Sequence, residues 1–79
     1  MSFIDEMGMK LADEALAEAV ASGDEKLVDR IAEVLGASSQ SLEEAFLTGI
    51  RVRRAESRAQ AMIKESKEKR SRDAAPAAG

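Results

Sequence analysis

Apolar residues recur along the first half of the chain at intervals of three and four positions, the spacing of one face of an α-helix. No segment alternates apolar and polar residues as a β-strand does. The predicted fold class is therefore all-α, with three helices: a helical hairpin followed by a long, basic C-terminal helix. Residues 1–70 are predicted to form a single helical domain and residues 71–79, small residues with one proline, a disordered tail.

The first predicted helix has signals at both ends. Ser2 can cap its N-terminus, with Asp5 three residues later, and Gly23 occupies the position after its last turn. The apolar residues between these signals form a broad, alanine-rich stripe of two rows: Ile4, Met7, Leu11, Ala15 and Met9, Ala12, Leu16, Val20.

The second predicted helix has the clearest amphipathic pattern. Asp24 is expected to cap its start and Gly36 to close it. One arc carries all of its larger apolar side chains, and acidic residues occupy the other side. The arc consists of Leu27, Val28, Ile31, Ala32, Val34 and Leu35.

The third helix is predicted after the linker ASSQ, from residue 42 to about residue 70. Ser41 followed by Glu44 forms a capping box, and Ser39 is the alternative cap. Ala45 and Gly49 lie one turn apart, so another helix of the chain can approach closely there. Beyond Val52 the apolar stripe weakens, and only a few residues partly continue it: Ala59, Met62 and Ile63.

The core predicted from these stripes is small, because a chain of 79 residues buries a limited fraction of its surface. Domains of this size often need disulfides, a metal or oligomerisation, and the chain has neither cysteine nor histidine. A homo-oligomer or a protein partner is therefore expected. The predicted core consists of Ile4, Met7, Leu11, Leu16, Val20, Leu27, Val28, Ile31, Val34, Leu35, Leu42, Phe46 and Ile50.

Charge is segregated along the chain. Residues 1–50 hold three basic and eleven acidic residues, a net charge of −8, whereas residues 51–79 hold nine basic and four acidic residues, a net charge of +5. Such asymmetry indicates a charged partner or a charged tail. The favoured partner is an acidic protein surface, above all the acidic half of another copy or of the same chain.

The candidate site is a protein-binding surface on the third helix, apolar on one side and rich in arginine beside it. Three of the arginines share a face opposite the apolar stripe, and Arg53 lies on the stripe side. The alternative interpretation of the arginines is a solvated helix face. The candidate residues are Leu42, Phe46, Gly49, Ile50, Arg51, Arg53, Arg54 and Arg58.

The stretch RIAEVLGASSQSLEEAF resembles the turn of a helix-turn-helix, with Ala32, Gly36 and Leu42 at about that spacing. Its second helix would present Glu43 and Glu44 to DNA phosphates, where affinity normally comes from lysine and arginine. Nucleic-acid binding, with Gln40 reading bases and the arginines holding phosphate, is therefore the disfavoured alternative to a plain helical hairpin.

The segments LAEAVASGDEKLVDRIAEVL and LEEAFLTGIR are similar to the helical cap module that precedes corrinoid-binding domains. The resemblance covers helix-hairpin features of about forty residues. The corrinoid domain with its histidine ligand is absent, so the resemblance implies no activity and no cofactor.

Catalysis is not expected, because the chain has no His, Cys, Tyr, Trp or Asn and no glycine-rich phosphate loop. No metal, cofactor or small-molecule substrate is expected either. No apolar run is long enough to span a membrane, and the first residues lack a basic signal-peptide segment, so a cytoplasmic protein is expected.

The predicted function is a small, non-catalytic protein–protein interaction module with a regulatory role, such as an adaptor, an inhibitor or a small chaperone. One alternative is a degenerate helix-turn-helix regulator that binds nucleic acid. The other is a structural subunit of a phage or secretion assembly, in which the charge segregation drives polymerisation.

Overall fold

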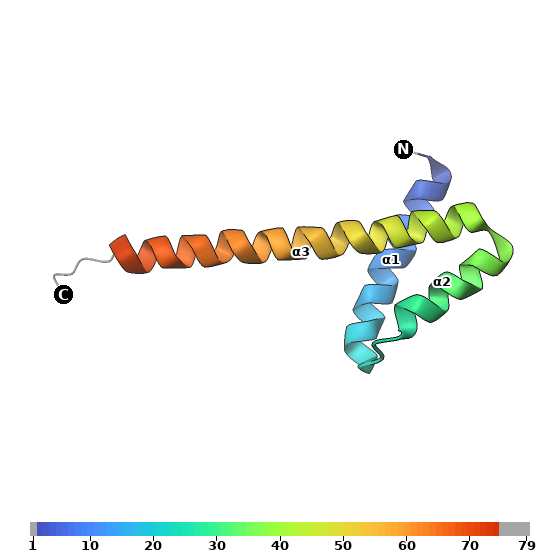
Figure 1. Ribbon diagram of the computed structural model, residues 1–79, viewed down its shortest axis with the longest axis horizontal. Helices are drawn as coiled ribbons and strands as arrows, with labels where there is room; N and C mark the ends of the chain where they lie inside the picture. The colour runs from blue at the N-terminus through green and yellow to red at the C-terminus, as the bar shows by residue number, and fades with distance from the viewer. Residues whose placement is uncertain (1, 75–79) are drawn as a thin grey trace.

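A computed structural model describes residues 2–74 and contains three helices and no strand in that range: α1 (Phe3–Ser22), α2 (Leu27–Ser38) and α3 (Gln40–Ala74) (Figure 1). The all-α, three-helix prediction is confirmed. The molecule measures 64 × 30 × 12 Å and has a radius of gyration of 18.0 Å. A compact chain of this length would have a radius of about 12 Å. The difference arises because the second half of α3 projects away from the other helices, as Figure 1 shows.

The ends of α1 match the sequence signals. The Oγ atom of Ser2 accepts a hydrogen bond from the backbone N–H of Asp5 at 3.1 Å. Gly23 ends the helix with a φ of 73°, a left-handed conformation that glycine adopts without a steric penalty.

The turn between α1 and α2 is held by Asp24, but α2 itself begins two residues later than an Asp24 cap implies, with Lys26 in the N-cap position. The Asp24 carboxylate accepts the backbone N–H of Lys26 at 3.0 Å and forms an ion pair with Arg30. The hydrogen bond from the Lys26 N–H, followed by the contact with the Arg30 guanidinium, lowers the pKa of Asp24 below its ordinary value. Asp24 therefore stabilises the turn that leads into α2.

This lowered pKa predicts a pH dependence of stability. The folded protein keeps Asp24 ionised at a lower pH than the unfolded chain does, so its contribution is complete at neutral pH and is lost as the pH falls below about 4. We expect Asp24→Ala to lower the thermal midpoint at pH 7 and to have a progressively smaller effect as the pH falls below about 4. Thermal unfolding followed by circular dichroism across this range measures the difference between the two proteins. A difference that does not change with pH would show that the charge of Asp24 has no role.

The junction between α2 and α3 differs from the prediction. Gly36 lies inside α2, which continues to Ser38, and the single residue Ser39 connects it to α3. The backbone N–H of Ser39 donates to the carbonyl oxygen of Leu35 at 2.7 Å, and its Oγ accepts the N–H of Leu42 at 3.1 Å. The predicted stop at Gly36, the linker ASSQ and the Ser41 cap were therefore wrong, and the alternative cap Ser39 is confirmed.

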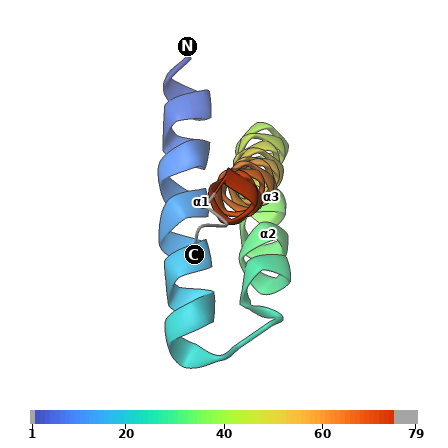
Figure 2. The ribbon, with the colours of Figure 1, turned by 90° about the vertical axis from the view of Figure 1, so that its left-hand side faces the viewer.

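The first half of α3 lies across α1, and this is the most extensive helix–helix contact of the fold, whereas α1 and α2 share the smallest one. α1 and α2 diverge from the turn at Gly23, and the first half of α3 bridges the gap between them (Figures 1 and 2). The predicted hairpin is therefore open, and α3 packs across it as expected.

Small residues make the α1–α3 crossing possible. A Cβ atom built on Gly8 would lie 2.6 Å from both the carbonyl carbon and the Cβ of Ala45. A Cβ on Gly49 would lie 2.9 Å from the Cβ of Ala12. Real Cβ atoms do not approach this closely, so the two backbones touch here only because glycine occupies both positions. α1 thus fills the notch that the sequence predicted at Ala45 and Gly49.

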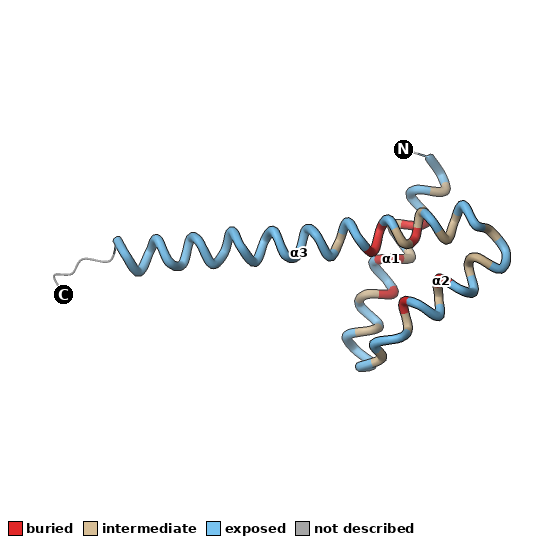
Figure 3. Tube along the Cα trace, viewed as in Figure 1, coloured by how far each residue is buried: buried red, intermediate tan, exposed pale blue. Residues whose placement is uncertain are grey.

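The core is concentrated around this crossing, as the red segments of Figure 3 show. Phe46 is its one large side chain without solvent exposure in the described residues. Val20 and Val34, predicted core residues, are exposed, because α1 and α2 turn those faces away from α3. The buried apolar side chains are Ala12, Ala15, Val28, Ala32, Phe46 and Ile50.

Beyond Ile50, α3 leaves the other helices. We call residues 2–50 the head and residues 51–74 the stem. Apart from Arg53, every stem residue is exposed. The helix reaches Ala74, so residues 71–74, which were assigned to the tail, are helical. The rest of the predicted tail, residues 75–79, lies outside the described residues.

Candidate protein interaction site

The apolar part of the predicted binding surface belongs to the core of this chain. Phe46, Gly49 and Ile50 are buried against α1, and Leu42 is half-buried. These side chains stabilise the head and do not face a partner in this conformation. The sequence could not distinguish the two uses, because an apolar stripe that packs on a neighbouring helix and one that packs on a partner have the same spacing.

Arg53 links the base of the stem to α1 through an ion pair with Asp13. Its Nε and NH2 atoms contact the two carboxylate oxygens of Asp13 at 2.7 and 3.3 Å, and its NH1 lies 3.0 Å from Glu56. The hydrogen bonds to Asp13 and then Glu56 raise the pKa of Arg53 above its ordinary value. The stripe-side position predicted for Arg53 thus has a structural use: it orients the stem relative to the head.

Arg51, Arg54 and Arg58 are exposed, and none forms an ion pair with residues 2–74. They begin a stem that holds nine basic and four acidic residues, a net charge of +5. The head from which the stem projects has a net charge of −8. The charge segregation seen in the sequence is therefore a spatial separation between an acidic head and a basic stem.

The stem also carries an exposed apolar strip. Its members share a side of the helix, because each lies three or four residues from another member, and the last two are adjacent. Met62 is 72% exposed and Ile63 is 55% exposed within the described part of the chain. The stem strip consists of Val52, Ala55, Ala59, Met62 and Ile63.

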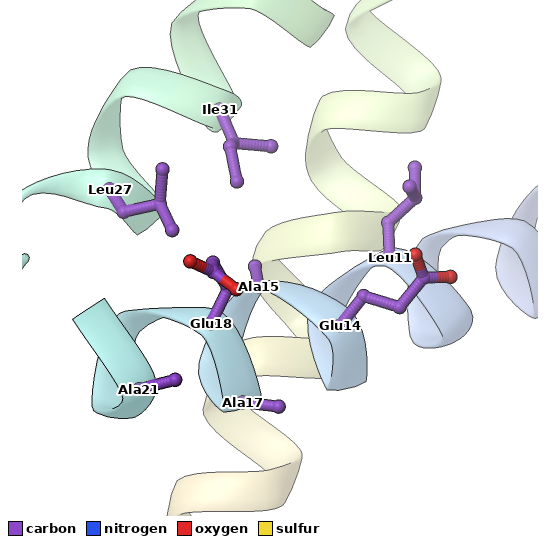
Figure 4. Close-up of a pocket in the computed structure, with 8 residues that line it drawn as sticks. All are labelled: Leu11, Glu14, Ala15, Ala17, Glu18, Ala21, Leu27 and Ile31. Carbon is purple, nitrogen blue, oxygen red and sulfur yellow. The ribbon is translucent and has the colours of Figure 1, made fainter.

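A second exposed apolar surface lies in the head, in a groove of about 670 Å³ between α1 and α2. Figure 4 shows Leu27 and Ile31 on the wall formed by α2, and Leu11 and Ala15 on the wall formed by α1. Leu11, Leu27 and Ile31 are half-buried rather than buried. We call this surface the head groove.

Two carboxylates, Glu14 and Glu18, lie one turn apart along the α1 wall of the head groove (Figure 4). Both side chains are exposed, and neither forms an ion pair with residues 2–74. The head groove therefore combines aliphatic walls with uncompensated negative charge. A ligand that fits it has apolar side chains flanked by positive charge.

The head groove is open because the two helices diverge and because α1 faces α2 with short side chains. Ala15, Ala17 and Ala21 are too small to reach across the widening gap. Sequence reasoning missed this groove, because Leu11, Leu27 and Ile31 were assigned to the core. Two signals were available: the run of alanines on α1 and the pair of glutamates one turn apart beside it.

Residues 2–74 contain no buried polar or charged side chain and no group of three or more potential metal ligands. The pKa shifts of Asp24 and Arg53 have structural causes, a turn and an ion-pair clamp. In the described part of the chain, no helix is both long and apolar enough to cross a membrane.

The residues of the helix-turn-helix alternative are placed unfavourably for DNA. A single residue separates α2 from α3, whereas the motif uses a turn of three or four residues. The carboxylate of Glu43 lies over Gly36, and Glu44 is exposed near the start of α3. The arginines lie about two to four turns further along the helix.

Comparisons of the chain with models of protein families, with curated proteins and with solved structures gave no match. The similarity to corrinoid cap modules therefore carries no argument here. The function has to be inferred from the head groove and the stem.

Proposed function

We propose that this protein is a small, non-catalytic protein–protein interaction module that binds a basic amphipathic helix in its head groove. The observation that carries the proposal is the groove itself: half-buried aliphatic walls between α1 and α2, with Glu14 and Glu18 exposed along one side. Roles as an adaptor, an inhibitor or a small chaperone all use such a surface. The cytoplasmic location expected from the composition is part of this proposal.

The energetics support a helical ligand. Covering Leu11, Leu27 and Ile31 removes aliphatic surface from water, at about 1.5–3 kcal/mol for each side chain that becomes fully buried. Because these three side chains are already half-buried, burying the rest of each contributes less binding free energy than this. A ligand must therefore cover several of them together. A helix that presents apolar residues once per turn does this, in the manner of helix-in-groove recognition.

Charge supports a basic ligand. The head has a net charge of −8, which attracts a cationic helix and repels an acidic one. Individual surface ion pairs contribute only about 0–1 kcal/mol, so Glu14 and Glu18 select and orient the ligand while apolar contact provides the affinity. The same negative charge disfavours nucleic acid as the ligand of the head.

The test uses two designed helical peptides with the same apolar face of leucine and alanine, one with lysine and the other with glutamate on its polar face. We expect the basic peptide, added in excess to the full-length protein, to shift the backbone amide NMR signals of Ala15, Leu27 and Ile31. The variant Glu14→Lys/Glu18→Lys should weaken binding by about tenfold or more, which corresponds to about 1.4 kcal/mol. Equal binding of the acidic peptide, or no shift at the head groove, would refute the proposal.

A further inference from the structure

We infer that the occupant of the head groove is the stem of a second copy of this chain, so that the protein associates head to stem. This inference rests on the proposed function and adds the identity of the ligand. It accounts together for the open groove in the head and the exposed apolar strip on the stem.

The stem has the features that the head groove requires. Met62 and Ile63 form the most exposed aliphatic part of the stem strip. Arg58 precedes Met62 by one helical turn, and Lys67 follows Ile63 by one turn, so positive charge flanks the apolar pair on both sides. In the groove, the apolar walls are likewise accompanied by two carboxylates one turn apart. Apolar surface therefore meets apolar surface while lysine and arginine meet glutamate.

The stem cannot occupy the head groove of its own chain. α3 is one continuous helix from Gln40 to Ala74 that projects away from the head (Figure 1). Between Ile50 and Ala74 it contains no glycine or proline at which a helix would kink. Arg53 also ties the base of the stem to Asp13 of α1. The stem that fills a head groove must therefore come from another molecule.

Charge selects head–stem pairing over stem–stem pairing. Two stems brought together place a net charge of +5 against another +5, whereas a stem on a head places +5 against −8. Arg58, one turn before Met62, adds local repulsion between stems, since it is exposed and forms no ion pair in residues 2–74. The second copy therefore presents its stem to the acidic head.

Docking also compensates for a weakness of the isolated chain. The stem is a solvated helix with almost no tertiary contact, and such helices are marginal in water. A head–stem contact is heterologous, so it leaves one stem and one groove free to bind further copies unless two chains exchange stems reciprocally.

The test is sedimentation equilibrium of the full-length protein at about 50 mM and about 500 mM salt, because surface charge is screened at the higher value. Three variants accompany the wild type. The groove variant is Glu14→Lys/Glu18→Lys, and the stem variant is Met62→Glu/Ile63→Glu. The control variant, Glu33→Lys/Glu44→Lys, reverses the same number of charges at exposed positions outside the groove and the stem. All substituted side chains are exposed, so circular dichroism should show the wild-type helix content in each variant.

We expect the wild type and the control variant to associate at low salt and to associate more weakly at high salt, where the charges that orient the contact are screened. The groove variant and the stem variant should each be monomeric at low salt, with dissociation constants raised about tenfold or more. An equal mixture of these two variants should form a heterodimer and nothing larger, because one intact groove and one intact stem remain between them.

Three results would overturn the inference: a wild type that is monomeric at low salt, a groove variant that associates as the wild type does, or a mixture of the two variants that stays monomeric. The peptide experiment tests the proposed function independently of self-association. If the basic peptide binds the head groove while the wild type stays monomeric, the module stands and its ligand is a different chain. If the peptide does not bind either, both proposals fall.

Discussion

Replacing Phe46 with alanine is expected to unfold the head at ordinary temperatures. Phe46 is fully enclosed and is the one large side chain in a buried set that is otherwise mostly alanine and valine. Removing a buried phenylalanine side chain costs about 3–5 kcal/mol, through lost burial and the cavity left behind. Natural domains have about 0.05–0.15 kcal/mol of stability per residue, so this loss is comparable to the whole stability of a domain of 79 residues. Thermal unfolding followed by circular dichroism, at high salt to suppress association, measures the effect.

The second phenylalanine of the chain provides the matched control. Phe3 is 72% exposed at the start of α1, so Phe3→Ala removes the same atoms from a site that is not packed. We expect its effect on stability to stay within about 0.5 kcal/mol. Equal effects of the two substitutions would contradict the position of the core at the α1–α3 crossing.

Replacing Gly8 with alanine is expected to destabilise the head although alanine is the better helix former. The added Cβ would lie 2.6 Å from backbone and Cβ atoms of Ala45, which cannot move aside as the end of a flexible side chain can. Overpacking of this kind costs about 1–3 kcal/mol, and the shift of two backbones places Gly8 at the upper end. The gain in helix propensity is only about 1 kcal/mol. Since each kcal/mol shifts the midpoint of a small domain by roughly 4–8 °C, the loss is measurable by thermal unfolding.

Gly36→Ala tests the same substitution where the neighbour can move. Gly36 also lies within a helix, and the atoms nearest to a Cβ there are those of the Glu43 carboxylate, the closest at 2.7 Å. Because that side chain can rotate away, the helix-propensity gain of about 0.5–1 kcal/mol should dominate and raise the midpoint. The thermal midpoint is therefore expected to fall for Gly8→Ala and to rise for Gly36→Ala. A stabilising Gly8→Ala would show that α1 and α3 do not cross as closely as described.

Local signals in the sequence were sufficient for the helices and for part of their ends. Ser2 and Gly23 were read correctly, because a cap and a left-handed glycine depend on a few neighbouring residues. Gly36 was misread because a glycine that ends a helix and a glycine that accommodates a neighbouring side chain look the same in one dimension. Which of the two applies depends on Glu43, which reaches Gly36 only once α2 and α3 are folded together.

The site was predicted less well than the fold, for a related reason. Spacing identifies which side chains share a face but not how far apart two faces lie. Phe46 and Ile50 were assigned to a partner as well as to the core, and the structure uses them in the core. Ile31 was assigned to the core and does pack against it, but it also lines the head groove together with Leu27, which spacing alone could not show. The charge segregation was visible from the start, because it is a property of composition along the chain.

The most direct test of the head–stem contact is an intermolecular paramagnetic relaxation measurement. The chain has no cysteine, so Ser57→Cys gives a unique attachment point for a spin label, on the side of the stem away from the strip. Spin-labelled protein is mixed at low salt with isotope-labelled, unmodified protein, so that only contacts between molecules broaden the observed signals. If the stem of one molecule occupies the head groove of another, the amide signals of Ala15, Leu27 and Ile31 are expected to broaden. Broadening confined to the stem, or no broadening at all, would contradict this head–stem contact.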